Sequence, residues 1–477
     1  MKILFYNWAR YDDCIGRGGG VTVYLHNLIE HFSEEPDIEC VFLCSGVEYT
    51  FDKKLRIEEI EAEYSPRVRA FQILNSPVHA PAATQSANLE VYLYDNSLYH
   101  VLEDFLESQG KIDVIHFHNL EGLSLPVLQL KKRFPETKFV FTIHNYYSFC
   151  PQVNLWAKDC NCYIHSLFPA CDDCLDKCNM QTEEFISSVK NALRKDGKSE
   201  NTAQPKALKK AANVFRGWFR FLGKRIAFKK NGQVDHQSLY TEFRKASVQT
   251  INQYMDCILA VSERTADIAR DYGILPEKLR TSYIGTKAAT IRQPPHVVHG
   301  DHLRIAYLGY ARKDKGFFFF LQALKTLPRD TAGKLDVLLA AKCGENEFLS
   351  IKKEIDAFAD HFYNITFLNG FNKTEQAQIL SQIDLGVIPS QWEDNLPQVA
   401  IEYVANGVPI LTSDLGGARE LCPSPLFVFK SENEKSLNDA LAHFADKPKL
   451  LETFWSKEPL LVTMEQHIDE LRQLYTE

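Results

Sequence analysis

Two carboxylates stand eight residues apart in the stretch PSQWEDNLPQVAIEYVANG, around an Asn-Leu-Pro turn. Asp394 comes just before the turn, and Glu402 follows it. A carboxylate can accept two hydrogen bonds from neighbouring hydroxyls, such as those of a hexose or a ribose. The spacing therefore fits two acids that hold two sugars in one pocket, although an N-cap Asp and a surface Glu would give the same pattern.

Other residue types in the chain are suited to a phosphate or a sugar. Arg312 and Lys315 lie in the loop GYARKDKG and could neutralise a diphosphate. Gly19 and Gly20 end the turn CIGRGGG, which lets backbone amides approach an anion but lacks the spacing of a dinucleotide site. His144 follows an apolar segment and could bind a sugar hydroxyl. Taken singly, each is equally compatible with a solvated loop, an ordinary turn or a structural histidine.

These residues all follow short apolar segments that read as β-strands. Strands alternate with amphipathic helices in the first half of the chain, and the same order returns in the second half. This pattern predicts two doubly wound α/β units, with the switch between them near 281–302. Ligands bind at the carboxyl ends of the strands in such sheets, so we expect these side chains to face one cleft.

The order of the motifs adds more than each one alone. A Gly-Gly turn, a strand-end histidine, a basic G-x5-K-G loop, DNLPQVAIE and GGxxE resemble the GT-B-fold glycosyltransferases of family 4. The resemblance implies two Rossmann-like domains facing across a cleft, with 1–290 for the acceptor and 300–455 for the nucleotide-sugar donor. It also implies that a final helix, within 456–477, crosses back onto the first domain.

The resemblance implies roles for individual residues as well. His144 and Asp394 would contact the transferred sugar and form the catalytic pair. The donor would be bound by Gly19, Gly20, Arg312, Lys315, Asn395, Leu396, Pro397 and Glu402. Members of this family are retaining enzymes, in which the acceptor attacks the face that the diphosphate leaves, so neither a protein nucleophile nor a catalytic cofactor is expected.

Two positions depart from the family pattern. The paired-glutamate motif begins here with Asp394, which is one methylene shorter, and Glu393 could replace it only with a shifted register. The family often has Arg after the glycine of the basic loop, where this chain has Tyr310. Arg312 is the candidate to replace that arginine.

The region 150–250 reads as an insertion in the first domain and begins with clustered cysteines. C-x-C followed by C-x2-C-x3-C is a metal-ligand spacing, which predicts a structural zinc site at Cys160, Cys162, Cys171, Cys174 and Cys178. Reduced thiols, disulfides and an iron–sulfur cluster are the alternatives.

The stretch QPKALKKAANVFRGWFRFLGKRIAFKK carries nine Lys or Arg residues and no acid, with an apolar stripe at helical spacing. The pattern predicts a helix that lies on an anionic membrane, with contacts from Lys224, Arg225, Lys229 and Lys230. A helix that packs on its own domain is the alternative.

Composition limits the remaining possibilities. The chain has 477 residues and a net charge of −8, so we expect no nucleic-acid partner. It has no apolar run long enough to span a bilayer, and MKILFYNWARYDD reads as a first strand, which predicts a cytoplasmic protein at the inner face of the membrane. The leading interpretation is a retaining glycosyltransferase with a lipid-linked saccharide acceptor in surface polysaccharide biosynthesis. The alternatives are an epimerase or phosphorylase of the same architecture and a non-catalytic membrane scaffold.

Overall fold

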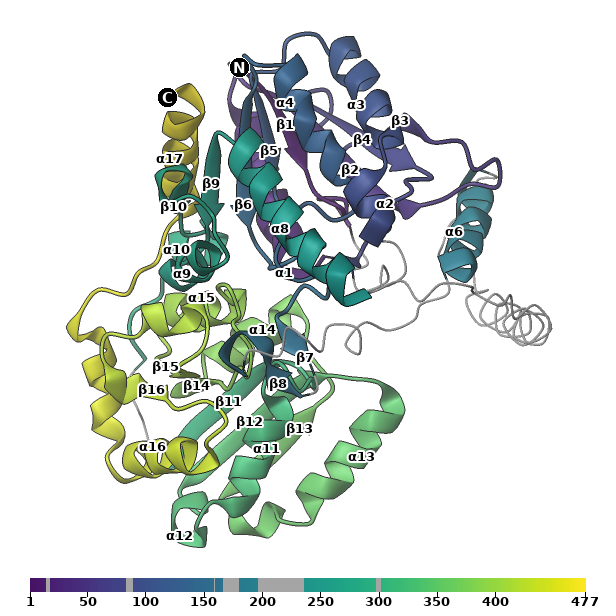
Figure 1. The fold of residues 1–477 in the computed structure, drawn as a ribbon. Coiled ribbons are helices and arrows are strands. Elements are labelled where there is room, and N and C mark those ends of the chain that lie inside the picture. The colour runs from purple at the N-terminus through teal and green to yellow at the C-terminus, as the bar shows by residue number, and fades with distance from the viewer. Residues whose placement is uncertain (14–17, 83–88, 158, 166–179, 196–235, 297–301) are drawn as a thin grey trace, which may run out of the picture.

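The computed structural model describes residues 1–477 apart from 14–17, 83–88, 158, 166–179, 196–235 and 297–301. Over this part the chain forms two lobes, each built around a mostly parallel sheet (Figure 1). The first sheet has the strand order β10-β9-β6-β5-β1-β2-β4-β3, and the second has the order β13-β12-β11-β14-β15-β16. The predicted α/β fold with two doubly wound units is confirmed.

In the eight-stranded sheet of the first lobe, every strand pair is parallel except β3 with β4 at the edge. The strands are β1 Lys2–Tyr6, β2 Glu39–Glu48, β3 Arg56–Ile60, β4 Val68–Leu74, β5 Val114–Phe117, β6 Lys138–Ile143, β9 Cys257–Ala260 and β10 Leu279–Thr281. The helices are α1 Gly19–Glu34, α2 Leu89–Tyr94, α3 Ser97–Ser108, α4 Leu130–Arg133, α6 Met180–Lys195, α8 His236–Tyr254, α9 Glu263–Asp271 and α10 Lys287–Thr290.

Both faces of this sheet are buried, which explains the continuous apolar runs of its strands. Along β1, Ile3 and Phe5 join a core that includes α1, whereas Leu4 and Tyr6 join the core on the opposite face with α2 and α3. Successive side chains of a strand point to opposite faces, so one short apolar segment serves both cores.

The second lobe repeats this arrangement. Its strands are β11 Leu303–Tyr310, β12 Leu335–Lys342, β13 Asn364–Leu368, β14 Leu385–Ile388, β15 Ile410–Ser413 and β16 Val428–Phe429. Its helices are α11 Phe317–Thr326, α12 Arg329–Ala332, α13 Glu345–Asp356, α14 Lys373–Leu380, α15 Gln398–Ala405 and α16 Glu434–Asp446.

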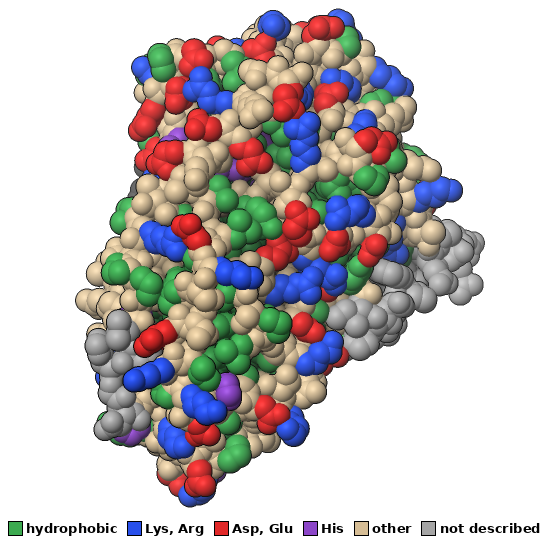
Figure 2. Space-filling model, turned by 90° about the vertical axis from the view of Figure 1, so that its left-hand side faces the viewer, with side chains coloured by type: hydrophobic (Ala, Val, Ile, Leu, Met, Phe, Trp, Pro, Cys, Tyr) green, Lys and Arg blue, Asp and Glu red, His purple; other side chains and the backbone are tan. Residues whose placement is uncertain are grey.

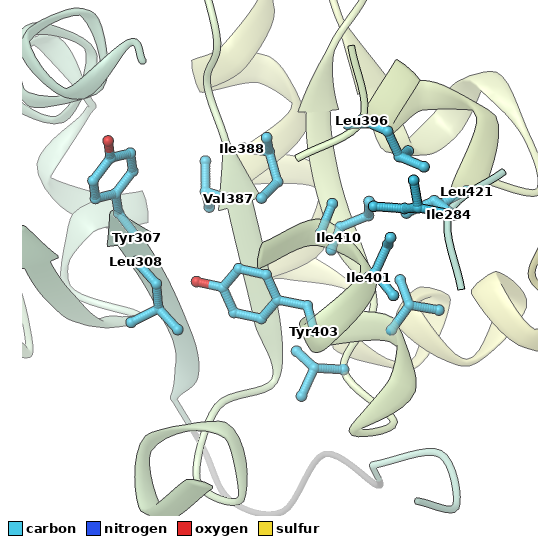
Figure 3. Close-up of a cluster of buried hydrophobic side chains, with 14 of the residues drawn as sticks. Ile284, Tyr307, Leu308, Val387, Ile388, Leu396, Ile401, Tyr403, Ile410 and Leu421 are labelled. Carbon is cyan, nitrogen blue, oxygen red and sulfur yellow. The ribbon is translucent and has the colours of Figure 1, made fainter. Parts of the chain in front are cut away.

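Tyr403 of helix α15 fixes this helix to the sheet of the second lobe (Figure 3). Tyr403 donates a hydrogen bond to the carbonyl of Ala306 in β11 at 2.9 Å, and its ring covers Gly386 of β14. A Cβ at Gly386 would lie 2.7 Å from that ring, so only glycine fits there. The helix and the strand before it are thereby fixed together, along with the turn that joins them.

The C-terminal helix, α17 Met464–Thr476, lies beside β9 and β10 of the first lobe (Figure 1). Hydrogen bonds join Tyr24 to His467 at 2.7 Å and His116 to Tyr475 at 2.6 Å. The end of the chain therefore returns to the lobe where the chain begins, as the resemblance implied.

Some elements differ from the expectation. The segment LSLPVLQLKKRF reads as one helix, but the structure divides it into a 3-10 helix, Leu125–Gln129, with Pro126 in its first turn, followed by the short helix α4. Helix α8 begins inside the predicted insertion, yet Phe243 and Ile251 are buried in the core of the first lobe. A small hairpin, β7 Trp156–Ala157 with β8 Cys160–Asn161, reaches toward the second lobe.

The surface view shows acidic and basic side chains interspersed over the face drawn, with hydrophobic side chains gathered near its middle (Figure 2). Among the described helices, none is long and apolar enough to cross a bilayer.

Candidate active site

A cavity of about 650 Å³ lies between the lobes, at the carboxyl ends of both sheets. Residues of the first lobe and of the second line it together. All the residues that the sequence analysis placed at the sugar and the donor reach this cavity: Gly19, Gly20, His144, Arg312, Lys315, Asp394, Asn395, Leu396, Pro397 and Glu402. Two doubly wound sheets that face each other produce this convergence.

The basic loop between β11 and α11 carries Lys315 into the cavity. Its Nζ lies 2.7 Å from Asp394 Oδ2 and 5.0 Å from the centre of the Trp392 ring. Gly316 follows with a φ of 75°, and a Cβ there would lie 1.6 Å from the carbonyl oxygen of Pro389. Glycine therefore allows this loop to pack against the end of β14, which brings the cation next to the acid.

Arg312 lies in the same loop, at the solvent-exposed rim of the cavity. Its guanidinium donates two hydrogen bonds to Asp314, at 2.9 and 2.5 Å, and about half of its side chain is exposed. Tyr310 also lines the cavity and is 52% exposed. Arg312 can therefore approach a ligand at the rim only in competition with Asp314.

In the acidic turn after β14, the neighbouring carboxylates of Glu393 and Asp394 point to different places. Asp394 lines the cavity, whereas Glu393 is fully buried and paired with Arg264 of the first lobe. The alternative in which Glu393 replaces Asp394 is wrong for this structure, because Glu393 faces the lobe interface instead of the cavity.

The Gly-Gly loop after β15 donates backbone hydrogen bonds to this acidic turn. The Gly416 amide donates to the Glu393 carboxylate at 2.9 Å, and the Gly417 amide donates to the carbonyl oxygen of Asp394 at 2.9 Å. A glycine amide can approach an anion closely, and the anion that the Gly416 amide contacts here is the carboxylate of Glu393.

Helix α15 begins where the sequence predicts, with Pro397 as its N-cap residue. One turn into the helix, Glu402 lines the cavity and accepts a hydrogen bond from Gln376 at 2.5 Å. Gln398 donates to the carbonyl oxygen of Gly20 at 2.7 Å, which joins the glycine turn of the first lobe to the helix N-terminus of the second. That N-terminus carries a partial positive charge suited to an anionic ligand.

His144 follows β6 and reaches the cavity from the first lobe. Its Nε2 lies 3.2 Å from Nδ1 of His118, which is fully buried. Burial lowers the pKa of His144 to about 3, and the neighbouring His467 acts in the same direction. The imidazole is therefore neutral at physiological pH and can donate or accept a hydrogen bond without adding charge.

Sequence reasoning missed several residues of the cavity. Asn145 lines it and donates to the buried Glu121 at 2.8 Å, while Asn154 donates to Asp314 at 3.2 Å. Gln376 lines it beside Glu402. The position of Asn145 directly after His144 was the available signal, since both follow the same strand.

The expected metal and membrane contacts lie largely outside the described residues. This holds for Cys171, Cys174 and Cys178, and for Lys224, Arg225, Lys229 and Lys230. Cys160 is the first residue of β8 and Cys162 begins the short helix α5, Cys162–His165. The Cys160 thiol donates to the Ala157 carbonyl at 3.4 Å. Within the described ranges, no three His, Cys, Asp or Glu residues come together to form a metal site.

Comparison with known proteins places each lobe in a family. Residues 18–166 match the family described as Glycosyltransferase Family 4, and residues 291–457 match Glycosyl transferases group 1. Spore coat protein SA of Bacillus subtilis (strain 168) is 27% identical over 157 residues, which cover 32% of this chain. The match spans 38% of that curated relative.

Solved structures share the fold along the whole chain. Sucrose-phosphate synthase from Thermosynechococcus elongatus has a TM-score of 0.56 at 15% identity and covers 100% of this chain and 98% of its own. HepE of Anabaena in complex with UDP has a TM-score of 0.59 at 12% identity and covers 100% of both chains. With one family match in each lobe and this shared architecture, the chain belongs to the GT-B glycosyltransferases.

Proposed function

We propose that the protein is a retaining glycosyltransferase that moves a sugar from a nucleotide-diphosphate donor to a saccharide acceptor. The observation that carries the proposal is the meeting of His144 from the first lobe with Lys315 and Asp394 from the second at one cavity. A neutral imidazole, a cation and a carboxylate together suit a sugar whose bond to a diphosphate is breaking.

Each group has a separate task in this reaction. Lys315 neutralises the departing diphosphate, assisted by the N-terminus of α15. Asp394 accepts hydrogen bonds from hydroxyls of the transferred sugar, and Glu402 does so from the ribose of the nucleotide. His144 contacts the sugar from the acceptor side.

The acids around the cavity support transfer with retention and without a protein nucleophile. Asp314 pairs with Arg312, Asp394 pairs with Lys315, and Glu402 accepts from Gln376. These are the described carboxylates that line the cavity. In the proposed roles Asp394 and Glu402 hold hydroxyls of the donor and Asp314 holds Arg312, so none of the three is assigned as a nucleophile. The acceptor hydroxyl itself is therefore expected to attack, on the face that the diphosphate leaves.

The donor is expected to be a UDP-sugar. HepE of Anabaena, which shares this fold, was solved with UDP and glucose and with UDP-glucose. Transfer and thermal-shift assays with UDP-, GDP-, ADP- and CMP-sugars test the proposal, with Lys315→Met as the control for binding in the cavity. Stabilisation of the wild type by one donor, lost in the variant and accompanied by transfer, supports it. An epimerase would convert the donor without an acceptor, and a scaffold would leave every donor unchanged.

A lipid-linked acceptor in surface polysaccharide biosynthesis, reached from the inner face of the membrane, is the finer part of the proposal. It is supported by the nine cationic residues of the segment that contains Lys224 and Arg225. Replacing Lys224, Arg225, Lys229 and Lys230 with Glu should release the protein from anionic vesicles. The control is Lys352→Glu with Lys353→Glu on α13, which is exposed on the other lobe. Equal vesicle binding by both variants would contradict the membrane contact.

We also propose structural zinc in the cysteine-rich segment, on the ligand spacing of its sequence. Metal analysis of the purified protein tests this, with Cys174→Ser expected to lower the zinc content and Cys343→Ser expected to leave it unchanged. A zinc-free wild type would end this part of the proposal.

A further inference from the structure

The buried Glu393 has a more specific environment than an ordinary interface acid. Its Oε2 accepts from Arg264 Nε at 2.9 Å and from the Gly416 amide at 2.9 Å, and its Oε1 accepts from Arg264 Nη2 at 2.6 Å. The side chain has no exposed surface. Its charge is therefore balanced by one guanidinium in a two-pronged geometry, which fixes distance and angle together.

The partners of Glu393 come from both lobes. Arg264 belongs to the first turn of α9 in the first lobe, and Gly416 follows β15 in the second. Glu393 precedes Asp394 directly, so the contacts that hold its carboxylate also restrain the backbone next to the acid that lines the cavity. A residue of the first lobe, Arg264, thereby holds the acidic turn of the second lobe that carries Asp394.

The start of α9 also holds the residue on the other side of Asp394. Ser262 donates to the Asn395 carbonyl oxygen at 2.7 Å, and the Asn395 side chain donates to Thr265 at 3.3 Å. Asp394 thus sits between two residues that are both bound by Ser262–Thr265 of the first lobe.

The start of helix α9, which makes these contacts, is itself held in place by several hydrogen bonds. Ser262 caps it by accepting from the Thr265 amide at 3.1 Å, and the Glu420 carboxylate accepts from the amides of Glu263 and Arg264 at 3.0 and 2.8 Å. The ring of Tyr163 covers the Arg264 guanidinium at 5.1 Å. Arg264 therefore has little freedom to leave Glu393.

The contact of Arg264 with Glu393 differs from other contacts across the lobe interface in the residue that it reaches. Other contacts, such as Gln398 with Gly20, also cross the lobe interface but do not reach the residues beside Asp394. A planar guanidinium that grips a buried carboxylate sets a geometry that lysine cannot reproduce.

We propose that Arg264 is a positioning residue for the sugar transfer: through Glu393 it holds the Asp394 carboxylate where the donor sugar lies when the two lobes are together. The inference rests on the proposed function. It adds that the alignment of the second lobe's acid depends on a side chain of the first lobe, so the geometry at the sugar is complete only when the lobes meet.

Chemical rescue of Arg264→Ala tests the proposal. A misplaced catalytic group costs on the order of 100-fold in rate, so we expect kcat to fall by about that factor while the KM for the donor changes by less than about threefold. Added guanidine should fill the space that the side chain leaves and restore kcat at least about tenfold. Arg264→Lys should stay far below the wild type, because it supplies charge without the two-pronged geometry.

The matched control is Arg280→Ala, which removes an exposed pair with Glu477 at 2.7 Å and should leave kcat and the guanidine response unchanged. Should Arg264→Ala fold poorly, Glu393→Gln keeps the shape of the site and should lower kcat with little change in KM. Variants with lower melting temperatures but wild-type kcat, or no rescue by guanidine, would reduce Arg264 to a lobe contact and overturn the inference. A wild type that transfers no sugar from any donor would instead end the proposed function, and the inference with it.

Discussion

Lys315 Nζ lies 2.7 Å from Asp394 Oδ2, and this ion pair joins the basic loop after β11 to the acidic turn after β14. The two side chains are 29% and 11% exposed. The cation proposed for the diphosphate and the acid proposed for the sugar thus neutralise each other in this structure. Under the proposed function, the diphosphate would compete with Asp394 for the lysine, and the sugar hydroxyls would compete with Lys315 for the aspartate.

Replacing Lys315 with Met should impair catalysis more than folding. The variant keeps the length of the side chain but removes the cation that is proposed to neutralise the leaving diphosphate, so that only the N-terminus of α15 and Arg312 at the rim remain. Loss of one such group typically lowers kcat by about 100- to 1,000-fold, and we expect a loss of this size in a transfer assay. Lys313→Met is the matched control, because Lys313 lies two residues away, is 60% exposed and pairs with Asp159. Equal activity of both variants would contradict the assignment of Lys315.

A second prediction concerns pH and the buried acid behind the acceptor side of the cavity. Burial raises the pKa of Glu121 to about 7, and its carboxylate accepts from Asn145 at 2.8 Å. The ionised form accepts the stronger hydrogen bond, so Asn145 is best fixed above that pH. We expect kcat/KM to rise with pH through about 7 and Glu121→Gln to remove this inflection. His144 should contribute no inflection there, because its pKa of about 3 keeps it neutral.

The same two groups should act oppositely on stability. Glu121 has a higher pKa in the folded chain than its ordinary value of 4.5, so the folded protein holds the extra proton and loses stability as the pH rises from about 4.5 to 7. His144 has a lower pKa in the folded chain than its ordinary value of 6.5, so the unfolded chain binds the extra proton and stability falls as the pH drops from 6.5 toward 3. Urea unfolding of Glu121→Gln and His144→Gln across pH 4–8 checks both signs.

A fourth prediction concerns the tautomer of His144. Nε2 of His118 is buried without a hydrogen-bond partner, and a buried N–H in that position would cost more than a bare nitrogen. His118 therefore carries its proton on Nδ1 and donates to Nε2 of His144, which leaves the His144 proton on Nδ1. His118→Asn can still donate and should retain most activity. An ionised aspartate in His118→Asp can only accept, so this variant should have a kcat about five- to tenfold lower at a pH where the carboxyl is ionised. If the two variants had comparable kcat at equal melting temperatures, the assignment of His118 as the hydrogen-bond donor to His144 would be contradicted.

Sequence reasoning reached the residues that follow strands. Lys315, Asp394 and Glu402 lie on segments whose strand and helix patterns are strong, and the carboxyl ends of parallel strands meet at one edge. The partner of Glu393 was out of reach, because Arg264 lies 129 residues away along the chain and only the approach of the lobes brings the two together. Local spacing also could not show what the amides of the Gly-Gly loop at 416–417 contact, since a pattern in one chain does not indicate which carboxylate an amide will meet.

The Gly-Gly loop gives the last prediction, because Gly416 supports the acidic turn at a place where no side chain fits. It has a φ of 66°, and a Cβ there would lie 2.2 Å from the carbonyl oxygen of Asp394 and 2.7 Å from its amide nitrogen. Gly110 has a similar φ of 73° but nothing within 4 Å of the same atom. Alanine at either position should cost about 1–2 kcal/mol in the free energy of unfolding for its backbone conformation. Only Gly416→Ala should also displace Asp394 and lower kcat, since the clash is with backbone atoms that cannot rotate away. If Gly110→Ala and Gly416→Ala lowered kcat equally at matched stability, the proposed support of Asp394 by the Gly-Gly loop would be contradicted.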